Sequence, residues 1–211
     1  MLKKKAIIVD YGCGNLTSIK RAIECLNFNA LITNDPKKIE SADRLILPGV
    51  GNFGYAMKSI NKLSIKQSIL KFLSLNKPFL GICLGMQLMF ESSEEDFFKE
   101  KGLSVFKGSV KKIPDLKDAI IPRVGWYNIS NKEDTLLNNK IFSNISYSDK
   151  FYFVHSYNVV SKSDNYHCLF HKHFNFSICT SIIKDNTFLF QFHPEKSSKK
   201  GLEIYKNFFS L

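Results

Sequence analysis

Long apolar runs are missing from this 211-residue sequence, and its cysteines are few and irregularly spaced. At the amino end, MLKKKAIIVD places three lysines before only four apolar residues, a run too short for the core of a signal peptide. No stretch approaches the roughly 18 to 20 apolar residues of a membrane-spanning helix. The five cysteines are odd in number and form no CxxC pair, which argues for reduced thiols rather than a disulfide framework or a zinc ribbon. We therefore expect a cytoplasmic protein that does not associate with a membrane.

Acidic residues are outnumbered: 30 lysines and arginines stand against 19 aspartates and glutamates, a formal net charge of +11. The lysines are scattered along the chain, and no basic run carries interleaved aromatic residues on a recognisable nucleic-acid-binding motif. Dispersed charge of this kind is typical of a solvated surface. We therefore expect no nucleic-acid partner, and a basic binding module is kept only as a minor alternative.

The sequence predicts a single domain over residues 1–211, because 44% of the residues are hydrophobic and no segment rich in Pro, Gly or Ser divides the chain. In the amino-terminal half, the apolar strands AIIVD, ALIT, RLILP and PFLGI alternate with helical patterns, including one long helical stretch from Met57 to Leu73. Such strands form a parallel sheet with helices on both sides. From about Leu103 to Phe192, short strand runs such as FYFVHSYNVV predict antiparallel hairpins, and Leu202 to Phe209 predict a closing helix. The expected fold class is α/β.

The motif GICLG places Cys83 at the carboxyl end of a predicted strand, the edge where open parallel sheets bind their ligands. Gly81 and Gly85 predict a sharp backbone turn around the cysteine, and MQLMF predicts a helix that begins after it. A helix amino terminus favours thiolate over thiol, and the amide of Leu84 points to where an oxyanion would form. Considered by itself, the motif fits both a nucleophile and a buried structural cysteine.

The motif QFHPEKS separates His193 from Glu195 by one proline. Pro194 favours an extended conformation at His193, in which residues i and i+2 project to the same side. The carboxylate of Glu195 would then hold one imidazole nitrogen while the other faces a nucleophile, as a relay of cysteine, histidine and carboxylate requires. The alternative is a surface histidine and glutamate at the entrance to a helix.

A glycine-rich loop, LPGVGNFG, follows another predicted strand. Its glycines allow main-chain amides at Val50 and its neighbours to face a ligand and to serve as a second oxyanion donor. The loop matches neither the dinucleotide-binding fingerprint nor a phosphate-binding loop. On its own, it says little about function.

The segment HCLFHKHF contains residue types that bind metals. Alternation along a strand would put His167, His171 and His173 on one face and Cys168 on the other. A hairpin with incidental histidines is therefore favoured over a metal site, and we expect no bound metal.

Together, the order of the motifs, LPGVGNFG, then GICLGMQ, then QFHPEKS, resembles the class I, triad-type glutamine amidotransferases over nearly the whole chain. Within that class, PGVGNFGYAM, GICLGMQLMF, YFVHSY and the GW pair at Trp126 look like the glutaminase subunits of imidazole glycerol phosphate synthase, in histidine biosynthesis. The resemblance implies a flavodoxin-like three-layer sandwich with a central, mostly parallel sheet and an antiparallel β extension. It also implies that Cys83 is the nucleophile, His193 the acid and base, and Glu195 the residue that orients His193.

The resemblance further implies a substrate, a partner and the residues that contact them. L-Glutamine is the implied substrate, with Val50 and Leu84 as oxyanion donors and with no cofactor. The residues implied to bind the substrate are Gly49, Gln87, Ser156 and Tyr157. The implied partner is the cyclase subunit of imidazole glycerol phosphate synthase, which would receive ammonia within a heterodimer. The implied contact face lies around Trp126, Tyr152 and Lys196.

One segment departs from the family pattern. Family members commonly read Pro-His-small-Gly-Trp-Asn, whereas this chain reads IPRVGWYN, with Arg123 at the histidine position and Tyr127 inserted after Trp126. Because this segment borders the synthase in the family, a second hypothesis keeps the glutaminase but sends ammonia to another acceptor, such as a sugar-modifying amidotransferase. The third hypothesis, a non-enzymatic basic binding module on the same fold, is disfavoured by the complete catalytic set.

Overall fold

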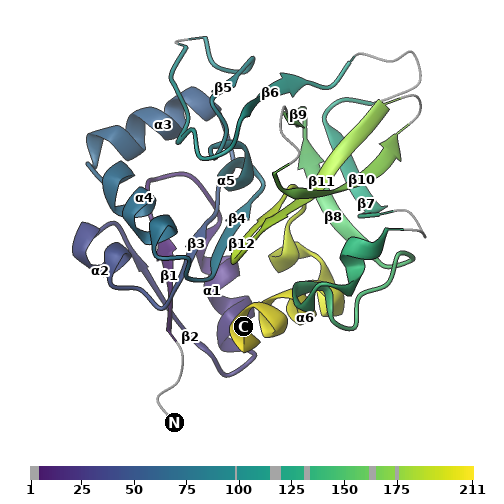
Figure 1. Ribbon diagram of the computed structural model, residues 1–211, viewed down its shortest axis with the longest axis horizontal. Helices are drawn as coiled ribbons and strands as arrows, with labels where there is room; N and C mark the ends of the chain where they lie inside the picture. Colours follow the sequence, from purple (N-terminus) through teal and green to yellow (C-terminus); the bar gives the residue numbers. More distant parts are fainter. Residues whose placement is uncertain (1–4, 98, 115–119, 131–133, 162–164, 174–175) are drawn as a thin grey trace.

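A seven-stranded sheet forms the centre of the computed structural model, which describes residues 5–97, 99–114, 120–130, 134–161, 165–173 and 176–211 (Figure 1). The strand order is β10-β11-β12-β4-β3-β1-β2, and the five strands from β12 to β2 run parallel. The parallel strands are β1 (Lys5–Val9), β2 (Asn29–Thr33), β3 (Arg44–Leu47), β4 (Phe79–Ile82) and β12 (Thr187–Phe190). The antiparallel extension consists of β10 (His167–His173) and β11 (Phe176–Lys184).

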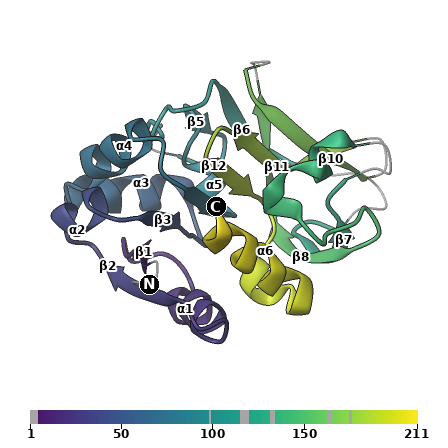
Figure 2. The same ribbon diagram turned by 60° about the horizontal axis from the view of Figure 1, so that its bottom comes forward.

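Helices cover both faces of this sheet, so the molecule has three layers (Figure 2). One face carries α2 (Pro36–Glu40), α3 (Phe53–Lys62) and α4 (Lys66–Ser74), and the other carries α1 (Leu16–Glu24) and α6 (Ser198–Ser210). Among the parallel strands the order β2-β1-β3-β4-β12 is that of a flavodoxin-like, doubly wound sheet. The predicted α/β sandwich with an antiparallel extension is therefore confirmed.

Side-chain caps explain where several helices begin. The side chains of Asn15, Asp35 and Asn52 each accept a hydrogen bond from a backbone amide in the first turn of α1, α2 and α3. The prediction of one long helix from Met57 to Leu73 is wrong, because α3 ends at Lys62 and α4 begins at Lys66. Between them Ser64 has a left-handed conformation with φ of 56°, which ends α3 in the usual manner of a helix carboxyl terminus.

Two small sheets lie beside the central one. β7 (Arg123–Asn128) pairs antiparallel with β8 (Lys150–His155), and a three-stranded sheet contains β5 (Ser92–Ser93), β6 (Gly108–Lys112) and β9 (Tyr157–Ser161). The predicted strand run FYFVHSYNVV is thus divided at Ser156 between two different sheets. Two short 3-10 helices, η1 (Thr135–Asn138) and η2 (Lys140–Phe142), precede β8.

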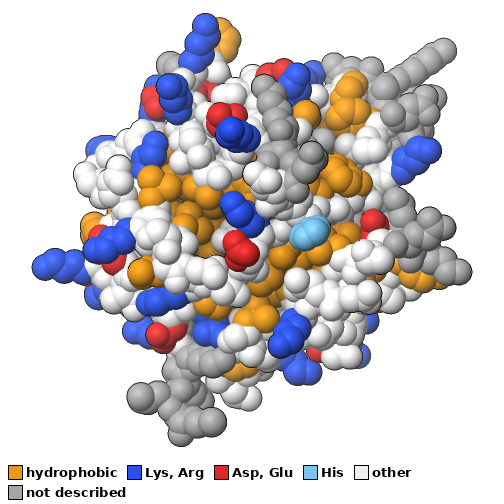
Figure 3. Space-filling view, in the orientation of Figure 1, with side chains coloured by type: hydrophobic (Ala, Val, Ile, Leu, Met, Phe, Trp, Pro, Cys, Tyr) orange, Lys and Arg blue, Asp and Glu red, His pale blue; other side chains and the backbone are white. Residues whose placement is uncertain are grey.

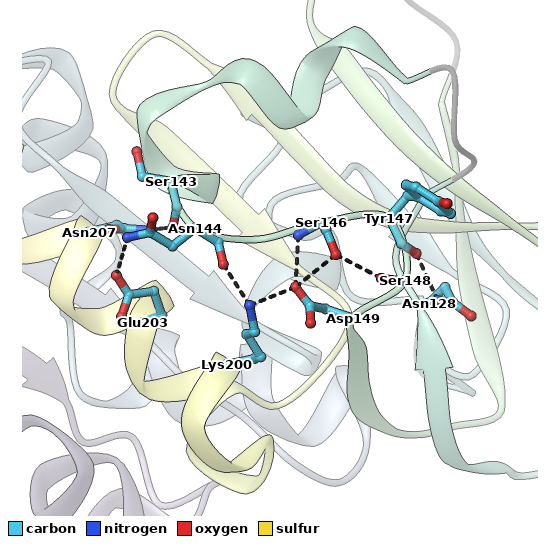
Figure 4. Close-up of polar contacts among 10 residues, drawn as sticks. All are labelled: Asn128, Ser143, Asn144, Ser146, Tyr147, Ser148, Asp149, Lys200, Glu203 and Asn207. Atoms are coloured by element: carbon cyan, nitrogen blue, oxygen red, sulfur yellow. Dashed lines mark hydrogen bonds and ion pairs between the residues drawn. The ribbon is translucent and has the colours of Figure 1, made fainter.

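A network of polar contacts ties the loop before β8 to α6 (Figure 4). The carboxylate of Asp149 accepts from the amide of Ser146 at 2.8 Å and pairs with Nζ of Lys200 at 2.9 Å. Lys200 also donates to the carbonyl of Asn144 at 2.7 Å, and the side chain of Asn144 donates to Glu203 at 2.9 Å. Since α6 follows directly after η3 (Pro194–Lys196), these contacts hold β8 against the segment that carries the QFHPEKS motif.

The lengths of the helices and the distribution of charge on the surface both bear on function. Among the described residues, no helix combines the length and apolar character needed to cross a membrane. On the face drawn in Figure 3, hydrophobic side chains gather in a band across the middle, and lysines and arginines are spread over the surface rather than collected in one patch. The dispersed basic residues match the pattern expected from the sequence.

Candidate active site

Three of the predicted functional segments meet at the carboxyl edge of the parallel sheet. Cys83 follows β4, the loop from Gly49 to Gly51 follows β3, and His193 follows β12. Because β3, β4 and β12 are adjacent and parallel, their carboxyl ends lie at the same edge. The sheet therefore brings together segments that lie up to 144 positions apart in the chain, from Gly49 to His193.

The turn at Cys83 is strained at the cysteine itself, which has φ of 52° and ψ of −109°. The sequence indicated that the flanking glycines make the turn, but their role is close packing. A Cβ at Gly85 would lie 1.8 Å from the carbonyl oxygen of Leu47, and a Cβ at Gly81 would lie 2.7 Å from Leu189. The helix after the cysteine, α5 (Leu84–Gln87), is a single turn and shorter than predicted. A non-glycine residue at positive φ is typical of a site where the backbone presents a functional side chain.

His193 and Glu195 form a buried pair. Nδ1 of the imidazole lies 2.7 Å from Oε1 of the carboxylate, and the two side chains are only 2% and 3% exposed. His193 is extended, with φ of −103° and ψ of 97°, and Pro194 begins η3. The alternative of a surface histidine and glutamate is therefore wrong.

The second imidazole nitrogen faces the cysteine. Nε2 of His193 is buried and makes no hydrogen bond of ordinary geometry in the described part of the chain. Burial lowers the pKa of His193, but the charge and contact of Cys83 and the carboxylate of Glu195 outweigh burial and raise that pKa from 6.5 to about 10. The electrostatics thus favour a protonated imidazole at His193.

Backbone contacts hold the histidine in place. The amide of His193 donates to the carbonyl of Tyr152 at 2.9 Å, and the hydroxyl of Ser197 donates to the carbonyl of His193 at 2.6 Å. The same hydroxyl accepts from the amide of Tyr152 at 2.9 Å. The strand β8 and the start of α6 therefore clamp the histidine from two sides.

The two predicted oxyanion donors, the backbone amides of Val50 and Leu84, differ in their surroundings. The amide of Leu84 donates to the carbonyl of Gly49 at 3.3 Å, so an incoming oxyanion would have to replace that carbonyl. Val50 is 40% exposed and lines the cavity in front of Cys83. Gly49 is tightly packed, because a Cβ there would lie 2.3 Å from the hydroxyl of Tyr11. A change in the backbone of this loop would free the amide of Leu84.

A cavity of about 440 Å³ opens in front of the cysteine. Of the residues expected to bind substrate, Gln87, Ser156 and Tyr157 line it, whereas Gly49 does not. The complete lining is Val50, Gly51, Cys83, Leu84, Gln87, Glu95, Pro122, Val154, His155, Ser156, Tyr157 and Lys196. Its size suits a small amino acid, and its wall carries several polar side chains.

Two ionisable residues in the lining, Glu95 and His155, were not predicted from the sequence. Glu95 accepts a hydrogen bond from the amide of Phe53 at 2.8 Å, and burial raises the pKa of its carboxyl. It belongs to the acidic run ESSEED, in which the sequence alone distinguishes no single carboxylate. His155 also lines the cavity, with Nδ1 2.8 Å from the carbonyl oxygen of Tyr157. The only signal for His155 was its place in the YFVHSY motif.

The residues expected at a partner interface lie together beside the cavity. The rings of Trp126 and Tyr152 meet edge to face with centroids 6.0 Å apart, and Nζ of Lys196 lies 5.7 Å from the centre of the Tyr152 ring. Trp126 is 47% exposed and Val124, on the same face of β7, is 50% exposed. An exposed apolar surface of this kind is typical of an interface.

Arg123, the residue that departs from the family pattern, is buried on the opposite face of β7. Its guanidinium carbon lies 3.6 Å from the ring centre of Tyr127 and 4.6 Å from that of Phe153. Within the described ranges, none of its side-chain nitrogens has a hydrogen-bond partner, and burial lowers its pKa from the ordinary value of arginine to about 10. The two unusual residues of IPRVGWYN therefore stack on each other on the face of β7 opposite Trp126, with Arg123 buried and Tyr127 half-buried.

The histidine-rich segment forms β10 at the edge of the central sheet. Within the described residues, no group of three or more His, Cys, Asp or Glu side chains is arranged to hold a metal ion. The side chain of His173 lies outside the described residues.

Comparison with known proteins agrees with this geometry. A family model described as "Glutamine amidotransferase class-I" matches residues 7–211. "Imidazole glycerol phosphate synthase subunit HisH" of Caldanaerobacter subterraneus is 44% identical and is aligned over 95% of each chain. The protein of the same description from Pyrococcus furiosus is also 44% identical, over 95% of this chain and 96% of its own.

Solved structures share the fold. The structure titled "Structure of PurLQS from Thermotoga maritima" superposes with a TM-score of 0.72 over 99% of both chains at 16% identity. A putative GMP synthase protein from Thermoplasma acidophilum gives a TM-score of 0.68 over 100% of this chain and 94% of its own at 21% identity. The chain belongs to the class I glutamine amidotransferase family. Within that family it belongs to the HisH subunits of imidazole glycerol phosphate synthase.

Proposed function

We propose that this chain hydrolyses L-glutamine to glutamate and ammonia and passes the ammonia to the cyclase subunit of imidazole glycerol phosphate synthase. The observation that carries the proposal is the buried set of Cys83, His193 and Glu195 behind a cavity that fits an amino acid. Residues 1–211 act as one glutaminase domain, and no metal or cofactor takes part.

The chemistry follows from the positions of these side chains. The amide of glutamine is a poor electrophile, so the reaction proceeds through a covalent intermediate. The sulfur of Cys83 attacks the side-chain carbonyl carbon, and the protonated Nε2 of His193 gives its proton to the amide nitrogen as the C–N bond breaks, so that ammonia leaves and a thioester remains. Water that the same histidine deprotonates then cleaves the thioester to glutamate. Glu195 keeps Nδ1 as the donor and so leaves Nε2 for catalysis.

The substrate's charged end fits the polar wall of the cavity. The half-buried carboxylate of Glu95 binds the α-ammonium of glutamine, and Gln87, Ser156 and Tyr157 surround the amino-acid end. Because the amide of Phe53 occupies part of the Glu95 carboxylate, its orientation is set before substrate arrives. This arrangement places the side-chain amide of the substrate toward Cys83.

Transition-state stabilisation depends on the loop after β3. The amide of Leu84 is engaged by the carbonyl of Gly49 in this conformation, so the oxyanion site is incomplete. Loss of one oxyanion donor costs roughly two to three powers of ten in rate. The isolated chain is therefore a slow glutaminase, and an event that turns the Gly49 carbonyl away raises kcat more than it lowers KM.

The partner docks on the face formed by Trp126, Tyr152 and Lys196, which borders the cavity. The relatives are named as synthase subunits, which supports a heterodimer with the cyclase. The IPRVGWYN departure favoured a different acceptor only as long as Arg123 and Tyr127 were expected at the interface. Both side chains lie on the face of β7 opposite Trp126 and stack on each other, whereas Trp126 keeps its outward position.

The test uses the purified chain and a cyclase of the imidazole glycerol phosphate synthase type from the same cell. Glutamate release is measured with and without the cyclase and its nucleotide ligand, for the parent, Cys83→Ala and Cys25→Ala. We expect strong stimulation of the parent and none for Cys83→Ala. Cys25→Ala should behave as the parent, because the thiol of Cys25 is exposed at the carboxyl end of α1, away from the cavity lining. Glutamate release by Cys83→Ala at the parent rate would exclude the mechanism. Absence of a complex would instead exclude the cyclase as partner.

A further inference from the structure

Besides the imidazole of His193, the side-chain amide of Gln191 contacts the sulfur of Cys83. Nε2 of Gln191 lies 3.5 Å from Sγ of Cys83, and Oε1 of Gln191 accepts from Nε2 of Gln87 at 3.0 Å. Gln191 is completely buried, whereas Gln87 lines the cavity. The three side chains thus form a hydrogen-bonded chain from the cavity wall to the sulfur.

The contact between Gln87 and the carbonyl of Tyr157 fixes the orientation of both side-chain amides. Nε2 of Gln87 also lies 3.4 Å from the carbonyl oxygen of Tyr157, a group that only accepts hydrogen bonds. The amino group of Gln87 therefore faces both acceptors, and Gln191 must present its oxygen to Gln87. Consequently the amino group of Gln191 points at Cys83.

The backbone around Gln191 allows the amide little freedom. Its own amide donates to the carbonyl of Thr180 at 2.9 Å, and the preceding carbonyl, of Phe190, accepts from the amide of Cys83 at 2.7 Å. The rings of Phe190 and Phe192 stack with centroids 4.8 Å apart. The donor is thereby held in place before the reaction begins, which is the condition for efficient electrostatic stabilisation.

We propose that Gln191 is a positioning residue that holds the sulfur of Cys83 in line with the cavity and favours its ionised form. A donor bonds more strongly to an anionic acceptor than to a neutral one, so an N–H aimed at sulfur stabilises thiolate over thiol. The inference rests on the proposed function of Cys83 as nucleophile. It adds a contribution that His193 does not supply, because the amide is uncharged and acts at every pH.

Other ionisable groups also face Cys83 and must be held constant in the test. They are His193 with Glu195 behind it, from the segment after β12, and Tyr11, from the loop after β1. The hydroxyl of Tyr11 donates to the carbonyl of Pro48. Replacements confined to Gln191 leave all three in place.

The experiment measures alkylation of Cys83 by iodoacetamide as a function of pH in the full chain with its cyclase. The variants are Gln191→Leu, which removes the donor at nearly constant volume, and Gln191→Glu, which replaces the donor by an anionic oxygen. We expect the pH of half-maximal rate to rise by about one unit for Gln191→Leu and by more for Gln191→Glu. At pH values well below the parent's half-maximal pH the rate should fall about tenfold for Gln191→Leu, and kcat should fall more than KM rises.

Two controls separate this effect from general damage. Alkylation of the exposed Cys25, read in the same digest, should be unchanged in every variant. Thr180→Val removes the hydroxyl bond to the carbonyl of Leu169, 3.2 Å long, and should lower stability without moving the Cys83 profile. If Gln191→Leu does not fold, Gln191→Met provides the same loss of the donor with a more flexible side chain.

Folded Gln191 variants with the parent's pH profile would overturn the inference while leaving the proposed function intact. A parent Cys83 that reacts at pH 7 no faster than Cys25 would instead remove the proposed nucleophile. The two failures are distinguishable because one is read in the variants and the other in the parent.

Discussion

Nδ1 of His193 lies 2.7 Å from Oε1 of Glu195, and both side chains are almost completely buried. The carboxylate accepts a hydrogen bond from the Nδ1–H group and thereby leaves Nε2 to face Cys83. Only one of the two carboxylate oxygens is engaged, since Oε2 is buried without a hydrogen-bond partner in the described part of the chain. The pair therefore depends on a single short contact for its geometry.

Replacement of Glu195 should be milder than replacement of His193. Glu195→Gln removes the orienting charge but leaves the base, whereas His193→Ala removes the base itself. By analogy with hydrolytic triads, we expect the loss in kcat to be about ten- to a hundredfold smaller for Glu195→Gln. Stimulated glutamate release in the presence of the cyclase checks this. Equal losses in two folded variants would show that Glu195 has a role beyond orientation.

The raised pKa of His193 predicts a pH dependence of stability. Because the pKa of His193 is about 10 in the folded protein and 6.5 in the unfolded chain, protonation of His193 stabilises the folded state. This contribution is fully present below about pH 6.5 and is lost as the pH rises through about 10. Cys83→Ala removes the largest of the effects that raise the pKa, so its unfolding free energy should decline less between those pH values.

Urea unfolding of the parent, Cys83→Ala and Cys25→Ala across the range between these two pKa values measures this difference. The parent and Cys25→Ala should share one pH dependence, and Cys83→Ala should have a flatter one. Parallel curves for all three proteins would mean that Cys83 does not act on the imidazole.

Replacement of the two buried arginines, Arg44 and Arg123, should change the unfolding free energy in different directions. Arg44 donates to the carbonyls of Phe208, Phe209 and Leu211, whereas Arg123 stacks on two rings and has no hydrogen-bond partner among the residues that the structure describes. Arg44→Met leaves three carbonyls without their donor and should cost about 1–3 kcal/mol. Arg123→Met removes a buried charge that lacks hydrogen bonds, and should leave the unfolding free energy unchanged or raise it by about 1 kcal/mol.

Denaturant unfolding of these two variants at pH 7 provides the comparison, since both change a buried arginine to the same apolar residue. A loss for Arg123→Met as large as that for Arg44→Met would show that stacking on Tyr127 and Phe153 outweighs desolvation. Contacts of this kind contribute roughly 2 kcal/mol when they are desolvated.

Trp126 should be important for binding of the cyclase. Truncation of a half-exposed tryptophan at the centre of an interface typically costs about 2 kcal/mol or more, or about 30-fold in Kd. Trp126→Ala should therefore weaken the complex and the stimulation together while leaving basal glutaminase activity unchanged. Leu75→Ala is the control, because Leu75 is similarly exposed but follows α4, near the amino end of β4. Calorimetric titration with the cyclase distinguishes them, and equal Kd values would move the interface elsewhere.

Much of the fold was predictable because it depends on local patterns. The strands β1 and β3 are apolar after their first residue and β4 is apolar throughout, and Asp35 with Pro36 is a local signal for the start of α2. The break between α3 and α4 was not predictable, because apolar spacing continues through Ser64 and nothing local requires its left-handed conformation. Likewise, FYFVHSYNVV reads as one strand run, and only competition between two sheets divides it at Ser156.

The residue types that carry the chemistry could be recognised from the sequence, because Cys83, His193 and Glu195 stand in short motifs whose spacing has a direct geometric meaning. What surrounds them depends on the folded chain. Gln191 reaches the sulfur and Glu95 enters the cavity because non-adjacent strands and loops pack together. The amide of Leu84 is engaged because the ends of β3 and β4 are in contact. Such contacts between distant segments leave no periodic trace in a sequence, so they emerge only when the chain is folded.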